Sequence, residues 1–230
     1  MAAALRRPAL ALLLALGAAF APRAAQPAAV LAAPVQAPDY EALAGDYPRP
    51  GSDGAKADLA ILLWLQRTRT ADDVRRAESE VAPDLALFAQ VTGRSLDAAR
   101  FPLTRALCAE AQEAVRQEIG RLKGHFARPR PYATWPEVHP AVRLEPSFAY
   151  PSGHSGWGVA SAGVLALLEP GRRQAILERG LLVGFDRVLA GVHHPSDVEA
   201  GQRVALAVTG AWLAAPEHRR RLEAARAAEW

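Results

Sequence analysis

Three short segments of the chain carry side chains that could bind and transform an oxyanion. The first runs from Lys123 to Pro131 and places Arg130 seven residues after the lysine. A lysine offers a compact positive charge, and an arginine offers a planar fork that matches two phosphate oxygens. Basic residues near a helix C-terminus also complement the helix dipole, so this segment alone does not establish a site.

The second segment is Pro151-Ser152-Gly153-His154, directly before a predicted helix. A glycine lets the backbone approach a ligand closely, and the free N–H groups at a helix start attract an anion. Ser152 could donate a hydrogen bond and His154 could protonate a leaving group. Taken alone, the segment is explained equally well by a turn with an N-cap serine.

The third segment contains Arg187, His193 and Asp197. Arg187 could bind an anion, His193 could act as a nucleophile, and Asp197 could accept the hydrogen bond that fixes the imidazole tautomer. The alternative is a surface turn in which Asp197 only complements a helix N-terminus.

Helices must position these segments, because apolar residues recur at helical spacing over most of the chain and no period-2 strand pattern stands out. The spacing of Ser196 and Glu199 is that of a capping box, which predicts a helix start directly after Pro195. We therefore expect an all-α, single-domain helical bundle. The predicted helices cover residues 56–69, 71–81, 83–92, 103–123, 155–168, 172–192 and 196–213. Five prolines between residues 127 and 150 predict a long irregular loop, which in a compact domain is usually functional.

The N-terminal sequence has the order of a secretory signal peptide: Arg6 and Arg7, an apolar run, then small residues. We predict a signal peptide over residues 1–33, an extended arm over 34–54 and the helical domain over 55–230. The protein would then be periplasmic or secreted, with no stable membrane span after cleavage. A retained membrane anchor is the alternative, although the apolar run is short for a span of about 20 residues.

Charge and cysteine content narrow the function classes. Removing residues 1–33 takes away Arg6, Arg7 and Arg23, so that 27 basic residues become 24, against 24 acidic ones. The basic excess expected of a nucleic-acid-binding protein disappears, and we expect no nucleic acid partner. Cys108 is the single cysteine, which excludes an intramolecular disulfide and fits a small core residue.

Together the three segments resemble the signature of the type 2 phosphatidic acid phosphatase superfamily, which includes the bacterial class A non-specific acid phosphatases and the vanadium haloperoxidases. The signature has lysine, six residues and Arg-Pro; then Pro-Ser-Gly-His; then Ser-Arg, five residues, histidine, three residues and aspartate. Asp186 departs from it, standing where the family has serine. That serine is not a phosphate ligand in the family, so the site is expected to be kept.

The resemblance implies a helical bundle and a secreted, metal-independent acid phosphatase that acts on a small-molecule phosphate ester without a cofactor. His193 would attack phosphorus to form a phosphohistidine, Asp197 would hold its other ring nitrogen, and His154 would protonate the leaving alcohol and then activate water. Arg128 and His194 match no position of the signature and are expected at the rim or in packing. The implied phosphate-binding residues are Lys123, Arg130, Ser152, Gly153 and Arg187.

Several alternatives stay open at this point. The same ligands could hold vanadate in a haloperoxidase, although family peroxidases are typically much longer chains. A phosphotransferase or a lipid phosphate phosphatase could use the same site, and a non-catalytic phosphate-binding protein would need no nucleophile. The sequence leaves open whether the protein is a homo-oligomer. A metallohydrolase is disfavoured because the histidines lack a recognised metal-ligand spacing; they are His125, His139, His154, His193 and His194.

Overall fold

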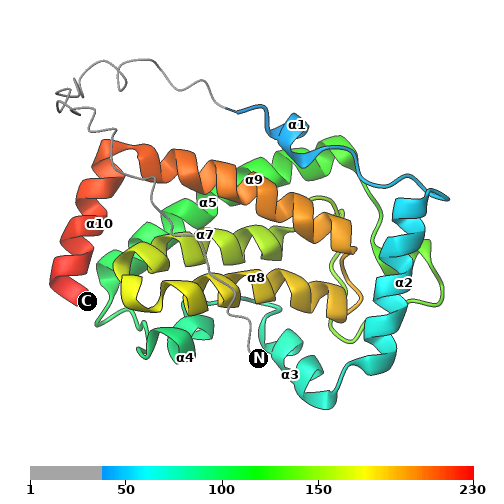
Figure 1. Ribbon diagram of the computed structural model, residues 1–230, viewed down its shortest axis with the longest axis horizontal. Coiled ribbons are helices and arrows are strands. Elements are labelled where there is room, and N and C mark those ends of the chain that lie inside the picture. Colours follow the sequence, from blue (N-terminus) through cyan, green and yellow to red (C-terminus); the bar gives the residue numbers. More distant parts are fainter. Residues whose placement is uncertain (1–37) are drawn as a thin grey trace, which may run out of the picture. The chain divides into compact units, whose positions relative to one another are not determined.

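The computed structural model describes residues 38–230, and this part of the chain is helical with no strand (Figure 1). The all-α prediction is therefore confirmed, whereas the predicted signal peptide over 1–33 lies outside the described residues. No helix in residues 38–230 is long and apolar enough to cross a membrane. The elements are α1 (Tyr40–Ala44), α2 (Asp53–Thr68), α3 (Ala71–Ser79), the 3-10 turn η1 (Leu85–Phe88), α4 (Ala89–Thr92), α5 (Pro102–Phe126), α6 (Pro131–Thr134), α7 (Gly153–Leu168), the 3-10 turn η2 (Pro170–Arg172), α8 (Arg173–Leu189), α9 (Pro195–Ala214) and α10 (Pro216–Glu229).

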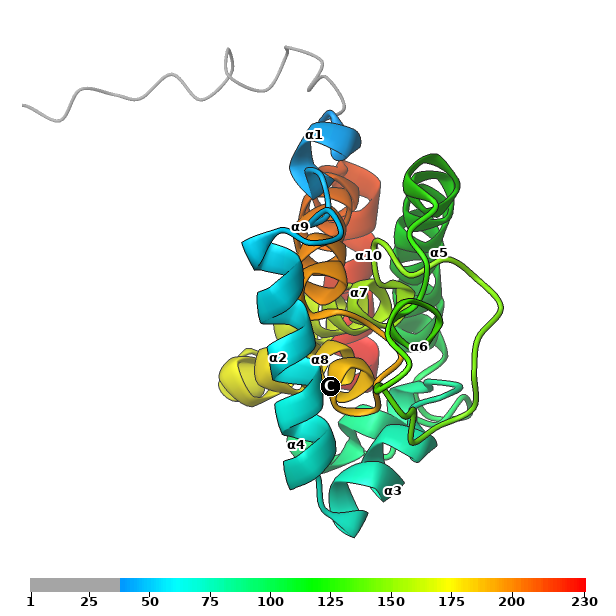
Figure 2. The same ribbon diagram turned by 90° about the vertical axis from the view of Figure 1, so that its right-hand side faces the viewer.

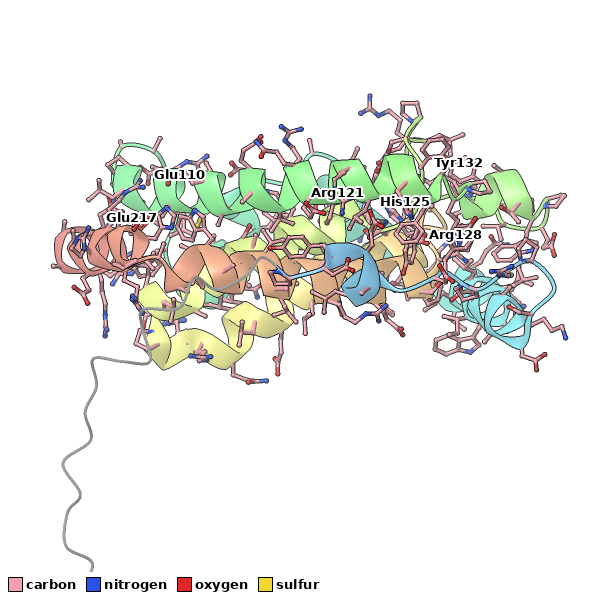
Figure 3. The ribbon with its side chains drawn as sticks, turned by 90° about the horizontal axis from the view of Figure 1, so that it is seen from above. Glu110, Arg121, His125, Arg128, Tyr132 and Glu217 are labelled. Carbon is pink, nitrogen blue, oxygen red and sulfur yellow. The ribbon has the colours of Figure 1, made fainter. Side chains whose placement is uncertain are left out.

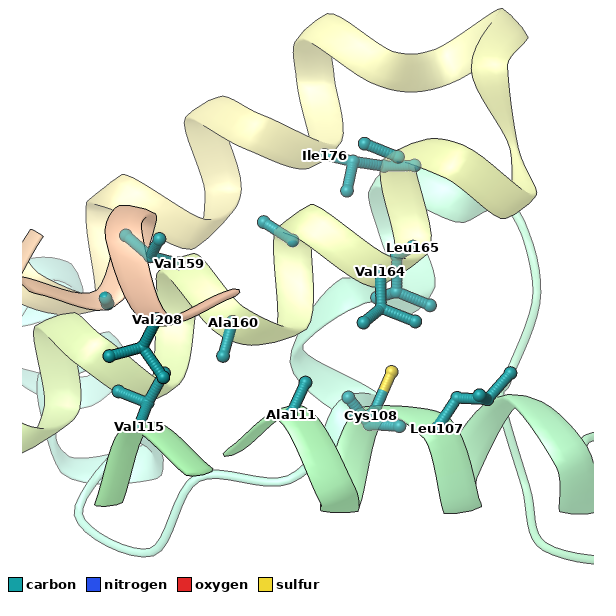
Figure 4. Close-up of a cluster of buried hydrophobic side chains, with 14 of the residues drawn as sticks. Leu107, Cys108, Ala111, Val115, Val159, Ala160, Val164, Leu165, Ile176 and Val208 are labelled. Carbon is teal, nitrogen blue, oxygen red and sulfur yellow. The ribbon is translucent and has the colours of Figure 1, made fainter. Parts of the chain in front are cut away.

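Helix α7 is the centre of the bundle. It contacts α5, α8 and α9, and it carries no Asp, Glu, Lys or Arg from Gly153 to Leu168 (Figures 1 and 2). A helix that is apolar on all sides is one that neighbours cover on all sides. Figure 4 shows part of this core, where Cys108 and Ala111 of α5 face Val164 of α7.

Two glycines allow α7 and α8 to pack backbone to backbone. A Cβ atom added to Gly158 would lie 2.2 Å from the carbonyl oxygen of Gly180, and one added to Gly180 would lie 2.6 Å from that of Gly158. No larger residue fits at either position without separating the helices. The close crossing fixes the register between the start of α7 and the end of α8, where the second and third segments lie.

Helix α2 lies across the ends of α8 and α9, and α3 packs beside the end of α8 (Figure 1). This end of the bundle also holds the turn between α8 and α9. The predicted helix over 172–192 ends earlier, at Leu189, because Gly191 with a φ of 76° begins a turn. The predicted capping box is wrong: His194 is the N-cap of α9, and its backbone N–H donates to the Asp197 carboxylate at 2.8 Å.

The segment predicted as an extended arm contains helix α1, so that prediction is wrong over Tyr40–Ala44. The Tyr150 hydroxyl donates to the carbonyl oxygens of Ala44 and Gly45, which ties α1 to the main domain. On α5, Arg121 forms an ion pair with Glu41, beside α1 in Figure 3. These tertiary contacts stabilise a helix of five residues, which is too short to form alone.

Candidate active site

The structure brings His193 and Asp197 together inside the protein. His193 is only 1% exposed, and its Nδ1 lies 3.1 Å from Oδ2 of Asp197. Its Nε2 lies 3.0 Å from Nη1 of Arg130, which can only donate. Both contacts are satisfied when the proton is on Nδ1 and the lone pair is on Nε2. This is the tautomer that a nucleophilic imidazole needs.

The surroundings keep this pair in the neutral imidazole and carboxylate forms. Burial lowers the pKa of His193 well below its usual value, and the charges of Arg130 and Lys123 lower it further. Burial alone would raise the pKa of Asp197, but hydrogen bonds from His193 and His194 hold it below the usual range. His193 therefore remains unprotonated on Nε2 into the acidic range.

Arg128 and His194, expected at the rim or in packing, are both buried and both bind Asp197. Nη1 of Arg128 lies 2.6 Å from Oδ1 of Asp197, and Nδ1 of His194 lies 2.9 Å from Oδ2. Nη2 of Arg128 also pairs with Asp58 of α2 at 3.0 Å. Figure 3 shows Arg128 at the end of α5, near α2. Sequence reasoning missed Asp58, and a lone aspartate in a helical pattern gave no signal for it.

Lys123 and Arg130 both lie near enough to His193 to lower its pKa, and both bond to the loop between α6 and α7. Nη1 of Arg130 donates to the carbonyl oxygen of Val192 at 2.8 Å and its Nε to that of Ser147 at 2.9 Å. Nζ of Lys123 donates to the carbonyl oxygens of Phe148 and Ala149. Burial, together with the charge of Arg130, lowers the pKa of Lys123 to about 7. The lysine therefore loses its charge near neutrality.

The second segment forms the N-terminus of α7 beside this pair. The backbone N–H of Ser152 donates to the carbonyl oxygen of Asp197 at 2.9 Å, which joins the second and third segments. The amides of the first turn, beginning with Gly153, are those that a helix leaves without an intrahelical acceptor. Burial, and next the charge of Arg187, lower the pKa of His154. The protonated form of His154 is therefore less favoured than that of an ordinary histidine.

Glu145 is a further residue that sequence reasoning missed. Its carboxylate lies between two site residues, with Oε2 2.8 Å from Nη2 of Arg130 and Oε1 3.6 Å from Nδ1 of His154. Although burial opposes it, the charge of Arg130 lowers the pKa of Glu145. An anion therefore already contacts the arginine fork and the histidine that a phosphate would contact. Its place in a proline-rich loop gave no spacing from which to predict this.

Arg187 is completely buried, and only part of its guanidinium group is hydrogen-bonded by the described residues. Nη2 donates to the carbonyl oxygen of Ala77 and lies 3.4 Å from a carboxylate oxygen of Glu80. Its Nε and Nη1 are buried and have no hydrogen-bond partner among the described residues. Unpaired buried donors are costly, so these two atoms are suited to an anion that is not part of the chain.

The departure at Asp186 is matched by a partner on another helix. Arg76 of α3 binds the buried Asp186 carboxylate with both arms, from Nε at 2.7 Å and from Nη2 at 2.8 Å. The charge of Asp186 thus has its own cation and does not need Arg187. This pair explains how the site accepts an aspartate where the resemblance predicts serine.

The structure thus joins His193 directly to Asp197 and Arg130, and Asp197 to the start of α7 at Ser152. Glu145 links Arg130 to His154, while Lys123 and Arg187 lie near enough to lower the pKa values of His193 and His154. The arrangement offers a neutral imidazole backed by a carboxylate, three cations, a helix N-terminus and a second histidine. These groups suit in-line transfer of a phosphoryl group to a nitrogen nucleophile. Among residues 38–230, no group of three or more His, Cys, Asp or Glu side chains is arranged to hold a metal ion.

Comparison with known proteins points to one family. The model of the PAP2 superfamily matches residues 105–221. The acid phosphatase of Zymomonas mobilis is 33% identical over 165 residues, which cover 69% of this chain and 62% of that protein. The non-specific acid phosphatase of Providencia stuartii is 34% identical over 108 residues, 45% of this chain and 44% of that protein. The chain thus spans less than two thirds of the length of either relative.

A solved structure supports the fold. The transmembrane PAP2 type phosphatidylglycerolphosphate phosphatase from Bacillus subtilis superposes with a TM-score of 0.53 at 22% identity. The match covers 70% of this chain and 85% of that one.

Proposed function

The chain belongs to the PAP2 superfamily, and on that basis we propose that it is a metal-independent acid phosphatase that hydrolyses phosphomonoesters through a phosphohistidine on His193. The observation that carries the proposal is the pairing of His193 with Asp197 through Nδ1, which leaves Nε2 with its lone pair beside Arg130. A protein that only binds phosphate has no need of a buried, tautomer-fixed imidazole.

In the first step, Nε2 of His193 attacks phosphorus and the bond from phosphorus to the ester oxygen breaks. His154 gives its proton to the departing alcohol, while Asp197 stabilises the positive charge that forms on the His193 ring. Lys123 and Arg130, with Arg187, Ser152 and the Gly153 amide, take up the charge on the phosphoryl oxygens. Preorganised cations and amides can supply much of the catalysis in such a transfer, so no resident metal is required.

In the second step, the now neutral His154 takes a proton from water as the water oxygen attacks phosphorus. The bond between phosphorus and Nε2 of His193 breaks, and inorganic phosphate leaves. His154 ends the cycle protonated and His193 neutral, so protons and electrons balance over the two steps.

Export to the periplasm or the medium forms part of the same proposal. It rests on the tripartite order of residues 1–33. N-terminal sequencing of the protein recovered after expression with its own leader tests it. A first residue between positions 22 and 38 supports export with cleavage, whereas Met1 or Ala2 contradicts cleavage.

The catalytic proposal is tested by hydrolysis of p-nitrophenyl phosphate in EDTA, with wild type, His193→Ala and the exposed-histidine control His139→Ala. We expect metal-free turnover in wild type and the control, and its loss in His193→Ala. Turnover unchanged in His193→Ala would refute the phosphohistidine mechanism.

Isotope labelling separates the two steps. p-Nitrophenolate leaves with little help from an acid, so His154→Ala should still form the phosphoenzyme but hydrolyse it slowly. Radioactive phosphate should accumulate on this variant as an acid-labile, base-stable label. The double variant that also carries His193→Ala should take up none, and label in that double variant would contradict His193 as its carrier.

A further inference from the structure

A groove of about 450 Å³ runs away from the candidate active site along α5. Three of its lining residues belong to the site, namely Lys123, Gly153 and His154. On α5 the lining positions continue at helical spacing back to Ala109, fourteen residues from Lys123. At 1.5 Å per residue, the groove follows the helix for roughly 20 Å. This length far exceeds what a phosphoryl group occupies.

The lining beyond the site is mainly apolar. Helix α5 contributes Val115 and Ile119, and the segment after α3 contributes Val81 and Pro83. Trp157 lies one turn after His154 on α7, and its ring is 6.0 Å from that of Phe88. The charged residues at the rim satisfy each other, since Arg116 binds Glu113 with both arms at 2.6 Å.

Close packing of α5 on α7 forms the floor. A Cβ atom at Gly156 would lie 2.4 Å from Cδ1 of Ile119 and 2.8 Å from Cγ1 of Val115. These two side chains can pack against α7 because Gly156 has no side chain. At Gly120, in contrast, an added Cβ would meet nothing within 4 Å. The groove is thus open on the α5 side at this position.

The chemistry of the site directs the leaving group into this groove. In an in-line displacement the ester oxygen departs on the side opposite the attacking Nε2 of His193, and its proton donor must lie beside it. His154 is that donor in the proposed mechanism and also lines the groove. The alcohol attached to the ester oxygen therefore extends from His154 toward Trp157 and Ile119.

We propose that this groove is a leaving-group subsite, and that the enzyme prefers phosphomonoesters whose alcohol carries an extended apolar group, such as two linked aromatic rings, over esters of small or hydrophilic alcohols. The inference rests on the proposed function, because it needs His154 at the leaving oxygen. Apolar contact in the groove stabilises the bound ester without touching the phosphoryl group.

The test compares phenyl phosphate with 4-biphenylyl phosphate, two esters of phenols with similar acidity. Partial burial of the second ring should raise kcat/KM by about tenfold, which corresponds to about 1.4 kcal/mol. Gly120→Leu places a side chain in the groove and should reduce this ratio to about one. Gly124→Leu is the matched control, because Gly124 is also on α5, also has nothing within 4 Å of an added Cβ, and does not line the groove. It should keep the wild-type ratio.

A wild-type ratio near one, or a ratio that survives in Gly120→Leu, would overturn the subsite. The corresponding phosphonates, which cannot be hydrolysed, separate this outcome from failure of the proposed function. If neither ester is turned over, a dissociation constant about tenfold lower for the biphenylyl phosphonate, lost in Gly120→Leu, still supports the groove. Equal dissociation constants overturn it.

Discussion

Replacing Arg76 with alanine should destabilise the protein by about 3 kcal/mol or more, because removing one partner of a buried ion pair leaves the other charge buried without compensation. Asp186 is completely buried and receives both arms of Arg76, at 2.7 and 2.8 Å. Glu80 is a second buried acid nearby, and its pKa is raised by burial and by the charge of Asp186. Without Arg76, the buried Asp186 carboxylate would lie near the buried Glu80 carboxylate without its own cation.

The reverse substitution should cost less. The Arg76 side chain is 33% exposed and lies 3.1 Å from Asp73. In Asp186→Ser the arginine can therefore still be solvated and paired. We expect a loss of about 1 kcal/mol. In a chain of this size, 1 kcal/mol shifts the Tm by about 2–4 °C, so Arg76→Ala should lower the Tm by roughly 6–12 °C and Asp186→Ser by a few degrees. The double variant should recover most of the loss.

Thermal unfolding followed by circular dichroism, with urea unfolding as a second measure, gives all four corners of this cycle. A coupling energy near zero, or an Asp186→Ser variant as unstable as Arg76→Ala, would refute the argument. The m-value must stay constant across the four proteins for the comparison to hold.

Three further predictions concern the site itself. Asp197→Asn should lower kcat by about a thousandfold or more, because the amide favours the tautomer with its lone pair on the wrong nitrogen; turnover within tenfold of wild type would contradict this. Glu145→Gln should lower the inhibition constant for inorganic phosphate by about tenfold, because a carboxylate no longer competes for Arg130, and a weaker inhibition would show that Glu145 aids binding. The value of kcat/KM should fall as the pH rises through about 7: the pKa of Lys123 is about 7 and that of His154 is lowered from its usual value, so both have lost their protons above this pH. A plateau extending to pH 9 would exclude both groups.

The sequence predicts the helices well, and the contacts between them poorly. Apolar residues at helical spacing identified α5, and α7 was predicted to within two residues of its start. The predicted helix over 172–192 extends past the end of α8 at Leu189. A glycine inside an apolar run is compatible with a helix, so the sequence did not predict the positive φ of Gly191. The short helix α1 was missed, since it depends on Tyr150 and Arg121 from elsewhere in the chain.

The candidate site shows the same difference between residues found from local sequence patterns and residues that act through long-range contacts. Spacing within each segment pointed to His193, Asp197 and Arg130, and the structure brings these three side chains into contact. Residues that act through pairing across the fold carried no local pattern. Asp58 and Arg76 lie among other charged residues on their helices, so nothing in the local sequence marks them. Their importance comes from the buried groups they meet, Arg128 and Asp186.

The way α2 and α3 close the end of the bundle bears on the order in which the protein can assemble. Asp58 bonds to the backbone N–H of Ser196, 138 positions later, and Arg76 bonds to a residue 110 positions later. Such separations require large loops to close before the contacts stabilise the chain. Folding is therefore slower than in a bundle whose contacts are between helices adjacent in the sequence. A chain interrupted before α9 would lack Ser196, which bonds to Asp58, and Asp197, which bonds to His193. The candidate active site is consequently among the last parts of the molecule to form.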